Sequence, residues 1–211
     1  MNLQVVFNVD IAMVLDECTN FPVDYSIAKD SMYRSMKWAE RSKNAWISRP
    51  GKGLFGIVQG GIYRDLREKS SEILQKLEFD GYAIGGLAVG EGQEQMLKVL
   101  DYTTDLLPSF KPRYLMGVGK PDDIIKAVLR GVDMFDCVLP TRSGRTGQAF
   151  TKFGPLNIRN SRYSVDESPL DANISNHASK DFSKAYLHHL FKNNEILGSV
   201  LLTLHNLSFY Q

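Results

Sequence analysis

The 211-residue chain has few cysteines and no long apolar run, and both absences narrow the class of protein. Two cysteines, Cys18 and Cys137, cannot build a disulfide framework, so we expect a reducing, cytoplasmic compartment. No apolar run approaches the roughly 18 residues that a membrane span needs, so we expect no membrane association. Residues 1–5 lack a basic region ahead of an apolar one, so we also expect no secretory signal.

Acidic residues are missing from one long stretch. Residues 138–165 contain no Asp or Glu and carry a local charge of +5, although the net charge of the chain is only +1. The five cations are Arg142, Arg145, Lys152, Arg159 and Arg162. Such a stretch is either a solvated basic loop or a surface that binds nucleic acid, and charge alone leaves both interpretations open.

The sequence also lacks a dinucleotide-binding or P-loop fingerprint, so we expect no nucleotide cofactor. Glycine turns do occur, at Gly85-Gly86 and at 117–119. Each is either a simple tight turn or a place where backbone N–H groups approach a flat base or a phosphate.

Five strand-length apolar segments alternate with amphipathic helical patterns. The segments are 11–15, 54–58, 82–87, 114–118 and 134–139. Between them, Leu66, Ile73, Leu74 and Leu77 fall on one helical face, as do Met96, Val99, Leu100 and Thr103. Pro121 and Gly131 mark the start and the end of another helix. This alternation predicts an α/β fold with a parallel sheet.

Polar or glycine residues recur at the carboxyl ends of the apolar segments. They are Asp16, Gln59, Gly85-Gly86, Gly117 and Asp136. Convergence of five strand ends on one site favours a barrel over an open sheet. We therefore expect a (β/α)₈ TIM-barrel type fold that is incomplete, with about the last five βα units. The polar stretch after residue 150 and the helical tail from Phe182 to about Tyr210 predict two domains, 1–150 as the partial barrel and 151–211 as a carboxyl-terminal helical subdomain.

Two carboxylates stand out because each directly follows an apolar segment or interrupts it. Asp136 lies between Phe135 and Cys137, and Asp16 follows Met13-Val14-Leu15. Burying a carboxylate is costly unless a partner satisfies it. Asp136 is therefore either paired with a nearby arginine or a nucleophile or general base at a strand end.

Seven motifs in chain order resemble the bacterial tRNA-guanine transglycosylases. They are Asp-Glu-Cys-Thr at 16–19, Phe-Gly-Ile-Val-Gln-Gly at 55–60, Gly-Gly-Leu-Ala-Val-Gly-Glu at 85–91, Tyr-Leu-Met-Gly-Val-Gly at 114–119, Met-Phe-Asp-Cys at 134–137, Pro-Thr-Arg-Ser-Gly-Arg at 140–145 and Asn-Ile-Arg-Asn at 157–160. The resemblance runs from about residue 10 to residue 211 and is to the carboxyl-terminal portion of the family.

The resemblance implies a reaction. This family exchanges guanine at the wobble position of tRNAs with a GUN anticodon for the precursor preQ1, in queuosine biosynthesis, through a covalent RNA–enzyme intermediate. Asp136 would be the nucleophile that attacks the ribose C1′, as in a retaining glycosidase. Asp16, Gln59 and the Gly86 N–H would bind the purine edge, and Met116 would pack against the base.

The resemblance also implies contacts with tRNA and with a second copy of the chain. Two loops would contact RNA, with Arg142 and Arg145 reading bases beside the wobble position. Their residues are Gly117, Val118, Gly119, Lys120, Pro121, Asp122 and Asp123, followed by Thr141, Arg142, Ser143, Gly144 and Arg145. The family works as a homodimer, and Phe182, Tyr186 and His189 occupy matching interface positions.

The sequence departs from the family in three respects. The second catalytic aspartate of the family, an acid/base within Asp-Ser-Gly-Gly, and the first three strands would both lie upstream of residue 1. The zinc site of the family has three cysteines and a histidine, whereas the matching positions here are Ile174, Asn176, Ser179 and His205. Only His205 is a retained ligand, so we expect no tightly bound zinc. A non-catalytic remnant or an RNA-binding partner subunit is the alternative to an active transglycosylase.

Overall fold

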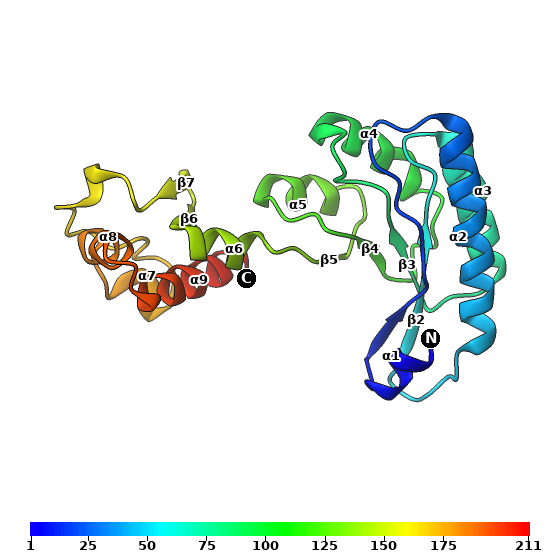
Figure 1. Ribbon diagram of the computed structural model, residues 1–211, viewed down its shortest axis with the longest axis horizontal. Helices are drawn as coiled ribbons and strands as arrows, with labels where there is room; N and C mark the ends of the chain where they lie inside the picture. Colours follow the sequence, from blue (N-terminus) through cyan, green and yellow to red (C-terminus); the bar gives the residue numbers. More distant parts are fainter. The chain divides into compact units, whose positions relative to one another are not determined.

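Five parallel strands and the helices between them form the first of two structural units (Figure 1). The computed structural model describes residues 1–211, which divide into Met1–Asp136 and Cys137–Gln211. The strands of the first unit are β1 (Ile11–Met13), β2 (Gly53–Val58), β3 (Gly81–Ile84), β4 (Arg113–Leu115) and β5 (Met134–Phe135). The expected division into a partial barrel, 1–150, and a carboxyl-terminal subdomain, 151–211, stays a prediction.

The five strands pair in the same order as they occur in the chain. Each pair is parallel, with Met13 opposite Phe55, Val58 opposite Ile84, Ile84 opposite Leu115, and Leu115 opposite Phe135. An open doubly wound sheet reverses its strand order at a switch point, and no reversal occurs here. The unit is therefore a curled half-barrel, which confirms the incomplete TIM-barrel type fold.

Helices connect consecutive strands and pack next to one another in chain order. They are α2 (Tyr25–Ala45), α3 (Arg64–Lys76), α4 (Gly92–Thr103) and α5 (Pro121–Val128), and a short α1 (Asn2–Val6) precedes β1. The four residues on the apolar face predicted for α4, from Met96 to Thr103, are all buried. None of the helices, the 21-residue α2 included, has the apolar length of a membrane-spanning segment.

The two faces of β2 have different roles. An ideal Cβ on Gly56 would lie 2.7 Å from the Phe79 ring and 3.1 Å from Leu74, so this glycine faces the helical layer. Alternation then places Phe55, Ile57 and Gln59 on the opposite, inner face. The Phe55 ring covers Gly81 on the neighbouring strand, where a Cβ would lie only 2.3 Å away. Gly81 therefore leaves the space that the aromatic ring fills.

Carboxylates close the amino-terminal ends of the strands. Asp80 precedes β3 and accepts from the Leu54 N–H of β2 at 2.8 Å, while its own N–H donates to the Leu54 carbonyl. Asp133 makes the same pair of bonds with Arg113 of β4, at 2.9 and 2.8 Å. These reciprocal bonds fix strand register at the end of the sheet opposite the predicted site residues.

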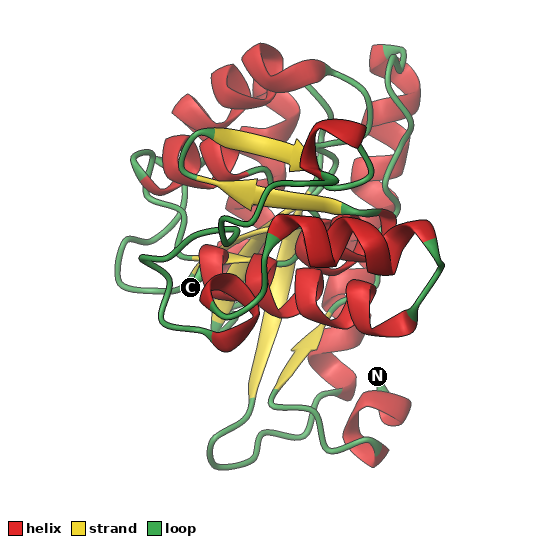
Figure 2. Ribbon diagram, turned by 90° about the vertical axis from the view of Figure 1, so that its left-hand side faces the viewer, coloured by secondary structure: helices red, strands yellow, loops and turns green.

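The second unit combines helices with a small antiparallel hairpin (Figure 2). Its elements are α6 (Leu139–Thr146), β6 (Gln148–Thr151), β7 (Gly154–Asn157), η1 (Ser161–Tyr163), α7 (His177–Lys180), α8 (Lys184–Lys192) and α9 (Ile196–Tyr210). The helical tail predicted from Phe182 onward is present as two helices, α8 and α9. The hairpin was not predicted, since the sequence pattern indicated irregular structure after residue 150.

Helices α6 and α9 approach each other closely. An ideal Cβ on Gly144 would lie 2.7 Å from the Thr203 backbone nitrogen, so only glycine fits without moving the backbone. Asn206 of α9 is fully buried and donates to the carbonyls of Pro140 and Gln148, both at 2.9 Å. Its side-chain oxygen accepts from the Phe150 N–H at 2.9 Å. One side chain thus joins α9, α6 and β6.

We predict that Gly81→Ala destabilises the first unit by about 1–3 kcal/mol, because the added methyl group would overlap the buried Phe55 ring. The measurement is urea unfolding of the purified chain. Gly53→Ala is the matched control, since it also begins a strand but its Cβ would meet Asp80 at an ordinary 3.5 Å. Equal losses for the two variants would contradict the packing argument.

Candidate active site at the carboxyl ends of the strands

Asp16, Gln59 and Gly85-Gly86 meet where β1, β2 and β3 end. The Gln59 side-chain nitrogen Nε2 donates to Asp16 Oδ2 at 2.6 Å, and the Gln59 backbone N–H donates to Ser70 Oγ at 3.1 Å. Gln59 is 2% exposed, whereas Asp16 is only half-buried. The amide and the carboxylate therefore satisfy each other at the rim of the half-barrel.

Both glycines of the β3 turn are required by their neighbours. A Cβ on Gly85 would lie 2.6 Å from Gln59 Nε2 and 3.4 Å from Asp16 Oδ2. A Cβ on Gly86 would lie 2.6 Å from Gln59 Oε1, and the Gly86 backbone has a φ of +66°. Close approach of the backbone to Gln59, together with a left-handed conformation, explains why this turn contains two glycines.

Asp136 lies directly after β5 and is held from the β4 side. Its Oδ1 accepts from the Tyr114 hydroxyl at 2.6 Å and from the Gly117 N–H at 2.7 Å. Burial, and then the hydrogen bond to Asp136, raise the pKa of Tyr114, so its hydroxyl stays protonated and donates. No arginine pairs with Asp136 within salt-bridge distance, so the arginine-paired alternative has no support in the structure.

Met116 connects the two groups of residues. Its N–H donates to the carbonyl of Ile84, the last residue of β3, at 3.4 Å, and its half-buried side chain packs against the barrel core. The β3 end, which carries Gly86, and the β4 end, which holds Asp136, are therefore neighbours. The structure thus brings the predicted catalytic and substrate-binding residues to one edge of one sheet.

The first predicted RNA-binding segment is partly exposed. Gly117, Lys120 and Asp122 are exposed, and α5 begins at Pro121. Val118, Gly119 and Asp123 are buried, and Asp123 accepts a hydrogen bond from the Gln93 side chain. Only part of 117–123 is therefore available to a ligand.

The second predicted RNA-binding segment, 141–145, is not a loop, as the sequence analysis expected, but lies within α6. Pro140 near the start of the helix and the left-handed Gly147 after its end delimit that helix. Arg142 and Arg145 are exposed and Thr141 is half-buried, whereas Ser143 and Gly144 are buried against the rest of the second unit.

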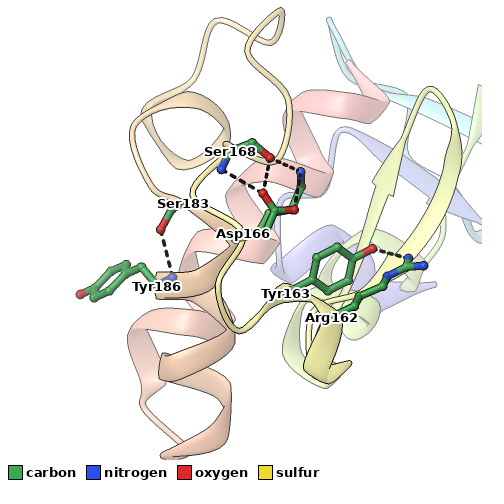
Figure 3. Close-up of polar contacts among 7 residues, drawn as sticks. Arg162, Tyr163, Asp166, Ser168, Ser183 and Tyr186 are labelled. Carbon is green, nitrogen blue, oxygen red and sulfur yellow. Dashed lines mark hydrogen bonds and ion pairs between the residues drawn. The ribbon is translucent and has the colours of Figure 1, made fainter.

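Two other cations of the basic stretch, Arg159 and Arg162, are used within the second unit. Arg159 donates to the carbonyls of Thr146 and Phe191 and lies over the Phe191 ring. Arg162 binds the Tyr163 hydroxyl (Figure 3). A nearby surface hollow of about 450 Å³ is lined by Arg162 and by Lys184, which is paired with Asp166 at 3.4 Å. These partners leave Arg142 and Arg145 as the better candidates for RNA contact.

The positions that match the zinc ligands of the family do not fit a metal. Ser179 Oγ lies 2.9 Å from His205 Nδ1, and His205 Nε2 lies 2.8 Å from the Phe150 carbonyl. Asn176 caps α7 by accepting from the Ala178 N–H and donates to Ser208 Oγ at 2.6 Å. Ile174 offers no donor atom, and both ring nitrogens of His205 are already engaged. A buried hydrogen-bond chain therefore occupies this place.

Tyr114 is a candidate site residue that sequence reasoning missed, because its hydroxyl donates to Asp136. It lies in an apolar segment, where an aromatic side chain normally indicates core packing, and its hydroxyl contact depends on a residue 22 positions away. A signal was present nonetheless, since a half-buried tyrosine hydroxyl usually has a hydrogen-bond partner and Asp136 directly follows the adjacent strand.

Comparison with known proteins gives a consistent result. The family model described as "Queuine tRNA-ribosyltransferase" matches residues 1–211. Curated relatives called queuine tRNA-ribosyltransferase include those of Rickettsia peacockii (strain Rustic) and Rickettsia typhi (strain ATCC VR-144 / Wilmington), each 58% identical over 209 residues, and that of Rickettsia akari (strain Hartford), 59% identical. Each match covers 99% of this chain and 58% of the relative.

We predict that the purified chain, saturated with zinc and then desalted, retains far less than one zinc per chain, and that EDTA leaves its unfolding midpoint unchanged. The control is a triple variant, Ile174→Cys, Asn176→Cys and Ser179→Cys, which supplies thiolate ligands beside His205 and is expected to bind zinc. Stoichiometric zinc on the unmodified chain would contradict the prediction and would point to His177, His188 or His189 as substitute ligands.

Proposed function

The chain belongs to the queuine tRNA-ribosyltransferase family, and we propose that it carries the nucleophile and the base-binding residues of a tRNA-guanine transglycosylase. The proposed reaction replaces the wobble guanine of tRNAs with a GUN anticodon by preQ1. The observation that carries the proposal is a carboxylate, Asp136, held at the end of β5 beside a donor and acceptor set at the ends of β1 to β3. The chain spans 58% of the length of the relatives it matches.

Asp136 acts as the nucleophile in this proposal. One carboxylate oxygen attacks the ribose C1′, the bond from C1′ to guanine N9 breaks, and guanine leaves with a proton from an acid. The incoming base then loses a proton and displaces the carboxylate from C1′, which restores Asp136. Because Tyr114 and Gly117 both donate to Oδ1, we assign the attack to Oδ2. The two donors orient the carboxylate before tRNA arrives.

Asp16, Gln59 and Gly86 recognise the purine. The Asp16 carboxylate accepts from the guanine N1–H and its exocyclic amine, while Gln59 Nε2 and the Gly86 N–H donate to O6. Without a base, Gln59 Nε2 donates to Asp16 instead, at 2.6 Å, so guanine has to replace this internal hydrogen bond. A base without matching donors would leave the carboxylate unpaired, which costs about 1–3 kcal/mol or more.

Arg142 and Arg145 contact the RNA beside the exchanged base, together with the exposed residues of 117–123. The intact protein is a homodimer in this proposal. The Phe182 and Tyr186 rings of the second unit stack at 5.7 Å, and Tyr186 is 40% exposed, which supports an aromatic contact surface.

We predict that Asp136→Asn abolishes both the covalent tRNA adduct and guanine exchange, with exchange falling by at least about 10³-fold, because an amide is a poor nucleophile. The enzyme for this test is a chimera that joins the upstream segment of the Rickettsia peacockii relative to residues 1–211. The measurements are exchange of labelled guanine into a GUN-anticodon tRNA and denaturing-gel detection of the adduct.

Tyr114→Phe is the matched control, since it keeps the carboxylate and removes one of its donors. We expect this variant to keep the adduct and to exchange guanine more slowly. Exchange by the Asp136→Asn chimera at the unmodified rate would overturn the assignment. We expect residues 1–211 alone to exchange no guanine, and robust turnover by them would require an acid/base within this chain.

A second prediction concerns the incoming base. By resemblance, Cys18 and Val89 match the bacterial pattern, and we expect the chimera to use preQ1 with a kcat/KM at least about 10²-fold above that for queuine, whose added ring needs space beside the base. Val89 is half-buried, and its N–H donates to Glu91. Val89→Ala should lower the ratio of kcat/KM for preQ1 to that for queuine, because the smaller side chain enlarges the pocket. Equal incorporation of both bases by the unmodified chimera would contradict the prediction.

A further inference from the structure

Arg67 is a fully buried cation that the proposed reaction does not use. It lies on α3 with a relative exposure of 0%, and no carboxylate pairs with it. Its Nε donates to the Gly61 carbonyl at 2.7 Å and its Nη2 to the Gly85 carbonyl at 3.0 Å. The third guanidinium nitrogen, Nη1, is buried without a hydrogen-bond partner. Burying an unpaired guanidinium is expensive, so its position needs an explanation.

The two carbonyls that accept from Arg67 belong to the turns of the proposed base site. Gly61 follows Gln59 by two residues after β2, and Gly85 immediately precedes Gly86 after β3. The Arg67 side chain therefore links the turn that carries Gln59 to the turn that carries Gly86. A Cβ on Gly86 would lie 3.7 Å from Arg67 Nη2, which shows how closely the guanidinium underlies this turn.

The bond to Gly85 fixes the direction of the Gly86 N–H. The Gly85 carbonyl and the Gly86 N–H belong to one peptide group, and in a trans peptide the two point in opposite directions. Because the carbonyl points toward Arg67, the N–H points away from it. The Gly86 amide accordingly faces Cys18. Burial and the charge of Asp16 raise the pKa of the Cys18 thiol, and the Gly86 N–H partly offsets this rise. That is the side of the turn where Asp16 lies.

We propose that Arg67 is a positioning residue for base recognition, which holds the Gly85–Gly86 peptide so that the Gly86 N–H faces O6 of the bound purine. This inference rests on the proposed function and deepens it. Arg67 does not touch the base. It acts through one peptide group, by setting its orientation and by polarising it.

Two physical features make arginine suited to this position. Its fork of N–H groups can reach two carbonyls at once, which the single ammonium of lysine does with less geometric control. Burial lowers the pKa of Arg67 to about 10, which is still above neutrality, so the guanidinium remains charged. A charged donor on the Gly85 oxygen polarises the peptide and strengthens the N–H on its other side. Glycines on both sides of this peptide otherwise allow it to rotate easily.

The test compares guanine with 6-thioguanine as the incoming base in the chimera described above. Both bases keep the N1–H and the exocyclic amine that Asp16 accepts, but sulfur at position 6 is a weak acceptor. We expect Arg67→Met to raise the KM for guanine about tenfold, the worth of one hydrogen bond, and to change the KM for 6-thioguanine by less than about threefold. The kcat for both bases should change by less than about threefold.

Arg64→Met is the matched control, because it removes the same cation from the exposed side of the same helix. It should leave the KM for both bases unchanged. Equal rises in KM for guanine and 6-thioguanine with Arg67→Met would show a general structural role and overturn the proposal. If Arg67→Met fails to fold, Arg67→Lys serves instead, since it keeps the charge and one donor. Arg67→Lys should also raise the KM for guanine and not that for 6-thioguanine, but by a smaller factor than Arg67→Met.

A direct readout separates this inference from the proposed function. In ¹⁵N-labelled residues 1–211, the Gly86 amide proton should shift upfield in Arg67→Lys, as the peptide loses polarisation, while the exposed Gly51 amide stays in place. An unchanged Gly86 resonance would overturn the positioning role whether or not the chimera exchanges guanine. A chimera that exchanges no guanine with Arg67 intact would instead refute the proposed function.

Discussion

Parallel pairing of consecutive strands places the carboxyl ends of β1 to β5 at one edge of the sheet, and every candidate site residue of the first unit depends on this constraint. Asp16 and Gln59 are 43 residues apart, and Tyr114 and Asp136 are 22 apart, yet each pair is hydrogen-bonded. Loops follow the strands at this edge, and they carry the polar groups of the site. Closing the other end with Asp80 and Asp133 keeps the register that aligns these loops.

The second unit is held together by buried polar side chains that bridge elements. Asn206 joins α9 to β6 and to Pro140 of α6, and His205 joins α9 to Ser179 and to Phe150. Each side chain uses its donors and acceptors on backbone or hydroxyl groups, which is the condition for burying it without a large penalty. These bridges cross-link the unit at the place where the family resemblance implies a metal. We therefore expect this unit to fold without zinc.

The sequence predicted the parts of the fold that depend on local patterns. Apolar segments located all five strands, and the helical face from Met96 to Thr103 is buried as expected. Four of the five segments extend beyond the carboxyl end of their strand. In three of them a buried loop residue, Val14, Leu87 or Val118, resembles a strand residue. The hairpin of β6 and β7 was missed because apolar and polar residues do not alternate in the sequence of either strand, QAFT at 148–151 and GPLN at 154–157. β6 packs against α6 and α9, and the local sequence does not reveal these contacts.

Most of the candidate site was predicted because motif residues adjoin strand ends, whereas Tyr114 and Arg67 were missed because their roles depend on partners across elements. In the sequence, Arg67 stands among Arg64, Glu68 and Lys69, a pattern typical of a solvated helix face, and nothing local separates it from them. In the structure it is the one cation of that group that is fully buried. A buried charge is tolerated only where the surrounding groups require it, and here those groups are two carbonyls of the glycine turns. Glycine has no Cβ, which lets the Gly85-Gly86 turn approach Gln59 closely. The missing Cβ also leaves the backbone of the turn free to change conformation. By binding the Gly61 and Gly85 carbonyls, Arg67 restricts the conformations that these glycine turns can adopt.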